Sequence, residues 1–365
     1  MRKRAIVNII EIDSRDSRYQ TGIERYLNVL RDNMPENIFT FRIIFYRISE
    51  CRAIKLNITD NELSIIHPIG FPTHTLYSAI ISMIGARING LQNLIVKSNC
   101  LGFEGLAYAI RANFYCHTVG VLHCVPKIIP GAPISNPLFN MDHIITVCDT
   151  SREWLNAVGN TRPVTTIFNG IERPKISAGK SDNTFRFIFA NGWAKHKGFE
   201  KIIPAIRHVA ARRNIEVIVL GGFCTEDDTN LFNEIADLPI RRVGLIDYDK
   251  VQHYYQNADC ALFASVSEAC SFAGIEAMAY NLPVISTNAP GLVEMFGPHG
   301  ALYIKHDTQM NINAEEYASA MMQVIDNRHL RTKLSVAAYS RYLQKYTARD
   351  MVRQTIDLYN KLIRP

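Results

Sequence analysis

The sequence predicts an α/β protein of two domains, each built on a parallel β-sheet. The chain has 365 residues, which is enough for two domains of ordinary size, and its 47% hydrophobic and 20% charged residues fit large buried cores. Short apolar runs alternate with helical patterns, and the alternation restarts after a polar segment at residues 171–183. Residues 260–286 read as strand, loop, helix and strand, which is the order of a parallel βαβ crossover.

Composition and charge exclude several classes of protein. The eight cysteines have neither C-x-x-C spacing nor a partnered histidine pattern, so we expect reduced core residues rather than a zinc site or disulfides. No stretch approaches the roughly 20 apolar residues that span a bilayer, and the basic start with its short apolar run to Ile10 reads as a strand. The net charge of +6 suits an anionic ligand or membrane surface, and no nucleic-acid motif accompanies it. We therefore expect a cytoplasmic protein without nucleic-acid partners.

The first half of the chain alternates strands and helices. Gly22 stands between the first strand and the first helix, where a glycine lets the backbone approach a ligand; an ordinary turn glycine is the alternative. His123 ends an apolar strand, at the edge where open α/β sheets bind ligands, although a core histidine bonded to backbone is also open. The expected strands are 5–10, 41–48, 63–69, 93–99, 118–123, 143–148 and 164–170, with helices at about 21–33, 76–89 and 102–113.

The apolar helix expected at 76–89 has two interpretations. It is too short to span a bilayer and carries Arg87 near its end. A core helix of the α/β layers is favoured, and a helix lying at a membrane interface is the alternative.

The second half restarts the alternation near residue 185. A loop at 191–198 joins strand 185–190 to a helix at 199–212 and carries Lys195 and Lys197, which solvation alone would explain. Further strands are expected at 216–221, 242–246, 260–264 and 283–286, with helices at 248–257, 272–280 and 351–363.

One loop and the helix after it carry the chemistry. The backbone N–H groups of Cys270, Ser271 and Phe272 lie at the expected helix N-terminus, where the helix dipole favours an anion. Glu268 precedes them and Glu276 follows, and each carboxylate can accept hydrogen bonds from vicinal sugar hydroxyls. This arrangement suits a sugar–diphosphate–ribose ligand. On spacing alone, however, a solvated loop acid and an exposed helix acid explain the two glutamates better.

A family resemblance favours the ligand-binding interpretation. Residues 268–271, 276–279 and 283–285 read EACS, EAMA and PVI, and residues 287–291 read TNAPG. This stretch resembles the E-x7-E signature and the glycine-bearing loop of retaining, nucleotide-sugar-dependent glycosyltransferases of family 4, which have the GT-B fold.

The resemblance assigns roles to residues elsewhere. Gly22 matches a glycine whose amide faces the donor diphosphate, and His123 matches a strand-end histidine that lines the sugar pocket. Lys197 matches the lysine that neutralises the diphosphate, and Leu245 is a weaker candidate for packing on the nucleobase. The family's usual arginine is absent from the lysine loop, where residues 191–193 read NGW, so Lys195 is a candidate substitute.

The resemblance implies two Rossmann-like βαβ domains facing each other across a cleft. Residues 1–175 would form the acceptor-side domain, joined by a C-terminal helix at 348–365, and residues 176–347 the nucleotide-sugar-binding domain. In the family, the leaving diphosphate departs from the face that the acceptor attacks. The implied catalytic residues are His123, Glu268 and Lys197, and the donor would bind Gly22, Lys195, Lys197, Leu245, Glu268, Cys270, Ser271, Phe272 and Glu276.

The expected function is transfer of a sugar from a nucleotide-diphosphate sugar to a glycan or lipid-linked acceptor in cell-surface polysaccharide biosynthesis. We expect a metal-independent, hexosyltransferase-like enzyme with no cofactor and with peripheral contact to the inner face of the membrane. A GT-B epimerase or phosphorylase-like enzyme is one alternative. A catalytically silent partner subunit is another, suggested by the missing arginine. The absence of G-x-G-x-x-G and of an Asp-x-Asp-like pair at a strand end disfavours a dehydrogenase and a metal-dependent transferase of the other fold.

Overall fold

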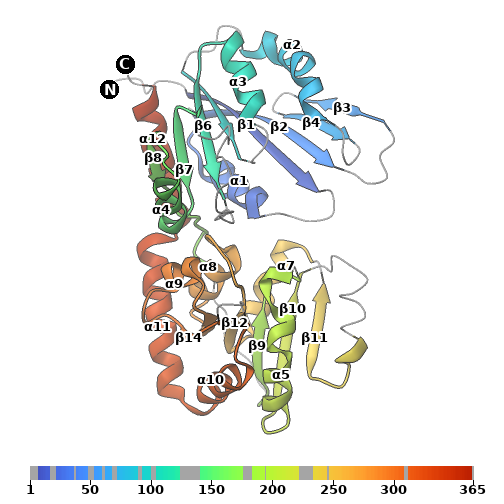
Figure 1. Ribbon diagram of the computed structural model, residues 1–365, viewed down its shortest axis with the longest axis vertical. Coiled ribbons are helices and arrows are strands. Elements are labelled where there is room, and N and C mark those ends of the chain that lie inside the picture. The colour runs from blue at the N-terminus through green and yellow to red at the C-terminus, as the bar shows by residue number, and fades with distance from the viewer. Residues whose placement is uncertain are drawn as a thin grey trace. The chain divides into compact units, whose positions relative to one another are not determined.

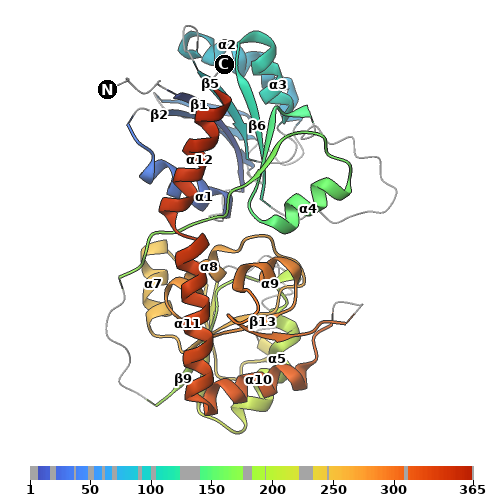
Figure 2. The same cartoon turned by 90° about the vertical axis from the view of Figure 1, so that its left-hand side faces the viewer.

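The computed structural model divides the chain into two compact units (Figures 1 and 2). One comprises Met1–Phe168 with Ala348–Pro365, and the other comprises Asn169–Thr347. The structure describes residues 7–16, 22–36, 38–47, 53–59, 62–67, 72–88, 93–99, 104–123, 140–175, 183–193, 195–221, 233–244, 246–307 and 311–363.

The first unit ends at Phe168, whereas the sequence predicted a domain boundary after residue 175. Ile171 explains the difference, because its N–H donates to the carbonyl of Tyr346 at 3.1 Å and its carbonyl accepts from the hydroxyl of Tyr342 at 3.2 Å. The Gln256 side chain donates to the carbonyl of Lys175 at 2.8 Å. These bonds tie residues 171–175 to the second unit.

The described part of the first unit contains an eight-stranded sheet in the order β3-β4-β2-β1-β5-β6-β7-β8. All its neighbouring strands are parallel except β3 and β4, which are antiparallel. The strands are β1 (Val7–Asp16), β2 (Ile38–Arg47), β3 (Lys55–Ile58), β4 (Glu62–His67), β5 (Leu94–Ser98), β6 (His117–Leu122), β7 (His143–Thr146) and β8 (Val164–Thr166). The helices are α1 (Gly22–Asn33), the 3-10 helix η1 (Thr73–Leu76), α2 (Tyr77–Ile88), α3 (Glu104–Asn113), α4 (Asp149–Ala157) and α12 (Ala348–Leu362).

Strand β1 is longer than the sequence predicted. It pairs with β2 on one side, as far as Asp16 opposite Arg47, and with β5 on the other. Backbone pairing on both sides therefore carries the strand past Ile10, where the apolar run ends.

Helix α2 joins the core of the first unit, as the favoured interpretation predicted. Ile80 is 1% exposed and belongs to one apolar cluster with Phe41 and Ile43 of β2 and Ile110 of α3. Helices that cover a parallel sheet bury both faces of its strands, and such strands therefore have continuous apolar sequences. Among the described residues, no helix combines the length and apolarity needed to cross a membrane.

The described part of the second unit contains a six-stranded parallel sheet in the order β11-β10-β9-β12-β13-β14. Counted from its first strand, this is the 3-2-1-4-5-6 order of a doubly wound dinucleotide-binding fold. The strands are β9 (Phe185–Phe189), β10 (Ile215–Leu220), β11 (Ile240–Gly244), β12 (Cys260–Phe263), β13 (Val284–Thr287) and β14 (Leu302–Ile304). The helices are η3 (Lys195–Lys197), α5 (Phe199–Ala210), α7 (Tyr248–Gln256), α8 (Phe272–Ala279), α9 (Pro290–Phe296), α10 (Ala314–Asp326) and α11 (Arg328–Lys345).

The core of the second unit lies between this sheet and its helices. Helix α5 turns Ile202 and Ile206 inward at a spacing of four, and both are fully buried with Phe187 and Val217 of the sheet. Tyr317 of α10 joins the same cluster, and its hydroxyl donates to the carbonyl of Phe263 at 3.3 Å. The packing fixes the strand ends from which the loops of the next section depart.

Helix α10 provides a test of local stability. The side-chain oxygen of Asn313 accepts from the N–H groups of Glu315 at 3.0 Å and Glu316 at 3.1 Å, which caps the helix. Asn313→Ala should lower the free energy of unfolding of the second unit by about 1 kcal/mol, because these donors lose their acceptor. Urea denaturation followed by circular dichroism measures the loss. Asn313→Ser retains an acceptor and should stay close to wild type; equal losses for both variants would contradict the cap.

Candidate functional site

The candidate site forms where the strand order of the second sheet reverses. Strands β9 and β12 are neighbours in the sheet although they are far apart in sequence. Both end at the same edge because they are parallel, so the loops at 190–198 and 264–271 leave the sheet side by side. Ligands of open α/β sheets bind at this edge, at the point of reversal.

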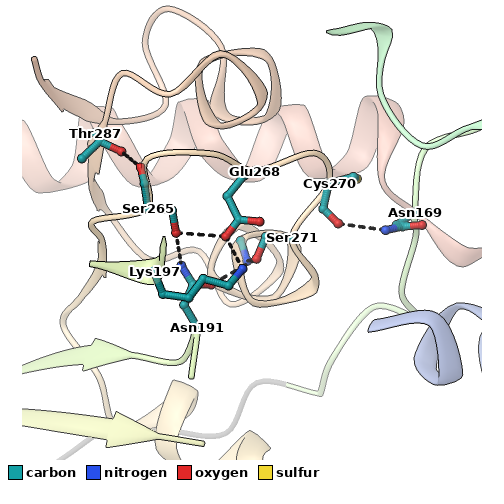
Figure 3. A network of polar contacts seen from close by, with 9 residues as sticks. Asn169, Asn191, Lys197, Ser265, Glu268, Cys270, Ser271 and Thr287 are labelled. Atoms are coloured by element: carbon teal, nitrogen blue, oxygen red, sulfur yellow. Dashed lines mark hydrogen bonds and ion pairs between the residues drawn. The ribbon is translucent and has the colours of Figure 1, made fainter. Parts of the chain in front are cut away.

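Lys197 and Glu268 meet between these two loops. The Lys197 ammonium donates to Oε1 of Glu268 at 2.5 Å, and the Ser265 hydroxyl donates to the same oxygen at 3.0 Å (Figure 3). The side chains of Lys197 and Glu268 are only 20% and 9% exposed. Glu268 is therefore not the solvated loop acid that its spacing alone suggested.

Asn191 links both loops through its side-chain amide. Its Nδ2 donates to the Ser265 hydroxyl at 3.4 Å, and its Oδ1 accepts from the Ser271 hydroxyl at 3.1 Å (Figure 3). Ser271 is the N-cap of α8 and accepts from the N–H of Gly274 at 3.4 Å. The end of β9 is thus bonded directly to the start of α8, a connection that sequence reasoning missed.

The N-terminus of α8 faces the same edge of the sheet. Cys270 precedes the Ser271 cap, and Phe272 is the first helical residue, as the sequence predicted. The carbonyl of Cys270 accepts from Nδ2 of Asn169 at 2.8 Å, and the carbonyl of Ser265 accepts from the hydroxyl of Thr287 at 2.5 Å (Figure 3). These bonds hold both ends of the loop that carries Glu268.

Two glycines permit close backbone approaches beside the site. Gly291 lies under the loop, where an added Cβ would lie 2.0 Å from the carbonyl oxygen of Glu268. Gly198 follows Lys197 with φ +73°, and a Cβ there would lie 2.3 Å from the carbonyl oxygen of Ala264. A residue with a side chain would displace the loop at either position.

Glu276 is buried rather than exposed. Its residue is 4% exposed on α8, and Oε2 accepts from the Tyr255 hydroxyl at 2.9 Å. The Tyr255 ring stacks on Tyr280 with centroids 5.3 Å apart and planes within 5°. Because Glu276 is buried, the alternative of an exposed helix acid is wrong. A buried carboxylate needs hydrogen-bond donors, and the Tyr255 hydroxyl is one of them.

In the first unit, His123 directly follows β6 and is partly buried. Its Nε2 is buried and has no hydrogen-bond partner among the described residues. Its ring meets Tyr26 edge-on with centroids 4.8 Å apart. Burial, and secondarily the nearby charge of Lys97, lower the pKa of His123 to about 3. The imidazole is therefore neutral near pH 7, with one buried nitrogen open to a hydroxyl partner.

The remaining predicted residues are more exposed or lie outside the described residues. Gly22 is the exposed first residue of α1 in the first unit. Lys195 is the exposed first residue of η3. Leu245 lies outside the described residues. The structure therefore brings Lys197, Glu268 and the start of α8 together, and it leaves Lys195 without the ion pair that Lys197 makes.

Sequence comparison finds a family model that matches part of the chain. Residues 171–341 match the family Glycosyl transferases group 1. The chain is 24% identical over 240 residues to the uncharacterized glycosyltransferase MJ1607 of Methanocaldococcus jannaschii. That match covers 59% of this chain and 59% of MJ1607, so the chain spans about three-fifths of that relative.

Structural comparison identifies the fold of the whole chain. The sucrose-phosphate synthase from Thermosynechococcus elongatus is similar with a TM-score of 0.75 and 16% identity, over 98% of this chain and 99% of that chain. Anabaena Alr3699/HepE in complex with UDP is similar with a TM-score of 0.73 and 13% identity, over 98% of this chain and 100% of that chain. The chain has the GT-B fold, and its match to the family Glycosyl transferases group 1 covers residues 171–341.

The Tyr255–Glu276 contact can be tested through stability. Tyr255→Phe keeps the ring but removes the hydroxyl that donates to Glu276. We expect the free energy of unfolding to fall by about 1–2 kcal/mol, because the buried carboxylate loses a donor. Chemical denaturation measures the change. Tyr254→Phe on the same helix is the matched control, since its ring keeps its contact with Arg241. A Tyr255→Phe variant as stable as this control would contradict the role.

Proposed function

We propose that the chain is a retaining GT-B glycosyltransferase that moves a sugar from a nucleotide-diphosphate sugar to a glycan or lipid-linked acceptor. The observation that carries this proposal is the meeting of Lys197, Glu268 and the start of α8 at the reversal point of a doubly wound sheet. The group 1 match over residues 171–341 supports it.

The leaving diphosphate would bind between Lys197 and the α8 N-terminus around Ser271. A diphosphate gains negative charge on its leaving oxygen as the sugar departs. A lysine ammonium and the positive end of a helix both stabilise that charge. Because Asn191 bonds the first loop to the α8 cap, the two stabilising groups are held together before the donor arrives.

Ribose and sugar hydroxyls would bind the two glutamates. Tyr255 holds the Glu276 carboxylate in one orientation, so a ribose diol would meet a preorganised acceptor. Glu268 would accept from hydroxyls of the transferred sugar. The neutral ring of His123 would offer Nε2 as a hydrogen-bond partner to a sugar hydroxyl. No residue is proposed as a nucleophile, and attack on the face of departure follows the family resemblance.

The proposal needs no cofactor and no divalent metal, since lysine and the helix dipole serve the phosphates. In the part of the chain that the structure describes, no group of three or more His, Cys, Asp or Glu is arranged to hold a metal ion. We place the enzyme in the cytoplasm, in contact with the inner face of the membrane where its acceptor is lipid-linked, in the synthesis of a cell-surface polysaccharide.

Mass spectrometry of nucleotide sugars retained after purification would identify the donor. The purified chain should then release nucleoside diphosphate in step with transfer to an acceptor, and nuclear magnetic resonance should show the anomeric configuration of the donor kept in the product. A changed sugar without transfer would indicate an epimerase. No turnover of any bound donor would indicate a silent partner subunit.

The two lysines of the loop should differ in their effect on turnover. Lys197→Ala should lower kcat by about 100-fold or more, because the leaving diphosphate loses its cation. Lys195→Ala is the matched control and should be milder, since Lys195 is exposed and makes no contact with Glu268. Steady-state kinetics on one donor compares the variants. Equal effects within a few-fold of wild type would show that neither lysine carries the diphosphate charge.

Turnover should persist in a metal chelator. The reason is that Lys197 and the α8 N-terminus carry the diphosphate charge in place of a cation. Release of nucleoside diphosphate measured with and without the chelator tests this. Complete loss of turnover, restored by magnesium or manganese, would overturn the metal-independent mechanism.

A further inference from the structure

The cation proposed for the diphosphate and the carboxylate proposed for the sugar are bonded to each other in this structure. Lys197 and Glu268 form an ion pair of 2.5 Å with side chains 20% and 9% exposed. Water screens such a partly buried pair less than it screens a surface pair. A ligand that binds the Lys197 ammonium and breaks this ion pair therefore also changes the environment of the Glu268 carboxylate.

We propose that the Lys197–Glu268 ion pair selects against nucleoside diphosphate that carries no sugar, and so favours release of that product after transfer. The inference rests on the proposed function. It makes Glu268 a determinant of ligand specificity in addition to a sugar-binding residue.

The selection follows from how Glu268 exchanges its partners. When Lys197 turns to a diphosphate, the largely buried carboxylate loses its cation, which is costly unless new donors replace it. A sugar attached to the diphosphate brings hydroxyl donors to Glu268 in the same binding event. A diphosphate without a sugar brings no such donors, so the full free-energy cost of separating Lys197 from Glu268 lowers its affinity.

The surroundings of Glu268 keep it from following the ammonium. Ser265 donates to the same carboxylate oxygen at 3.0 Å, and its own hydroxyl accepts from Asn191 at 3.4 Å. Thr287 holds the carbonyl of Ser265 at 2.5 Å (Figure 3). The carboxylate is thus anchored to a loop that is bonded at several points, whereas Lys197 has a flexible four-carbon stem.

A double-mutant cycle tests the proposal. Calorimetric titration with UDP, GDP and ADP first identifies the diphosphate that wild type binds, and that diphosphate is then titrated into Glu268→Gln, Lys197→Met and the double variant. Glu268→Gln should bind it about tenfold tighter than wild type, because Lys197 no longer has to leave a charged partner. The matching nucleotide sugar should not gain affinity, because the glutamine is a weaker acceptor for its hydroxyls.

The cycle separates release of Lys197 from simple repulsion between Glu268 and phosphate. In the Lys197→Met background, Glu268→Gln should change diphosphate affinity by less than about twofold, since the pair no longer exists. Tightening that is as large in this background as in wild type would overturn the proposal, as would no tightening in Glu268→Gln alone. If neither wild type nor Glu268→Gln bound any of the three diphosphates, the proposed function itself would fail, and this inference with it.

A control variant removes the same charge elsewhere in the second unit. Asp326 pairs with Arg213 at 2.9 Å, with side chains 49% and 40% exposed. Arg213 lies just before β10 begins, at the edge of the sheet opposite the site. Asp326→Asn should leave diphosphate affinity unchanged; an equal gain in this variant would attribute the effect to net charge and overturn the proposal.

Discussion

The pairing of β9 with β12 is the constraint on which the site depends. Ala261 pairs with Ile188 in the middle of the sheet, although the two residues are far apart in the chain. This parallel pairing places the loop that carries Lys197 beside the loop that carries Glu268. The Asn191 amide then bonds the two loops through Ser265 and Ser271. The ion pair between Lys197 and Glu268 therefore depends on the pairing of β9 with β12.

Asn191 and Gly192 also explain how the loop is built without the usual arginine. Gly192 has φ +75°, and among the described residues nothing beyond its chain neighbours lies within 4 Å of where a Cβ would be; as a glycine it contributes no side chain to the site. Asn191 contributes hydrogen bonds but no charge. Lys197 is therefore the residue of this loop that supplies positive charge near the start of α8, because Lys195 is exposed.

The sequence predicted those features that depend on local pattern, and missed those that depend on distant partners. Apolar runs predicted strands β9 to β13 of the second unit, and the N-terminus of α8 lies at Phe272, where helical spacing placed it. The burial of Glu276 could not be predicted, because its donor, Tyr255, comes from α7. Nor could the bond from Asn169 to Cys270, whose residues are 101 positions apart. Such contacts are decided by the sheet order, which no local pattern contains.

Charge balance connects the missing arginine to the behaviour of the ion pair. With two cations in the loop, one could stay on Glu268 while the other neutralised a phosphate. Among the described residues, Lys197 is the one cation paired with Glu268, so under the proposed function the phosphate and the carboxylate would compete for the same ammonium. In the proposed function a sugar would resolve the competition, because its hydroxyls would replace the ammonium at Glu268 and add no charge. The absence of the arginine is thus compatible with the proposed activity, and it would increase the dependence of diphosphate binding on the attached sugar.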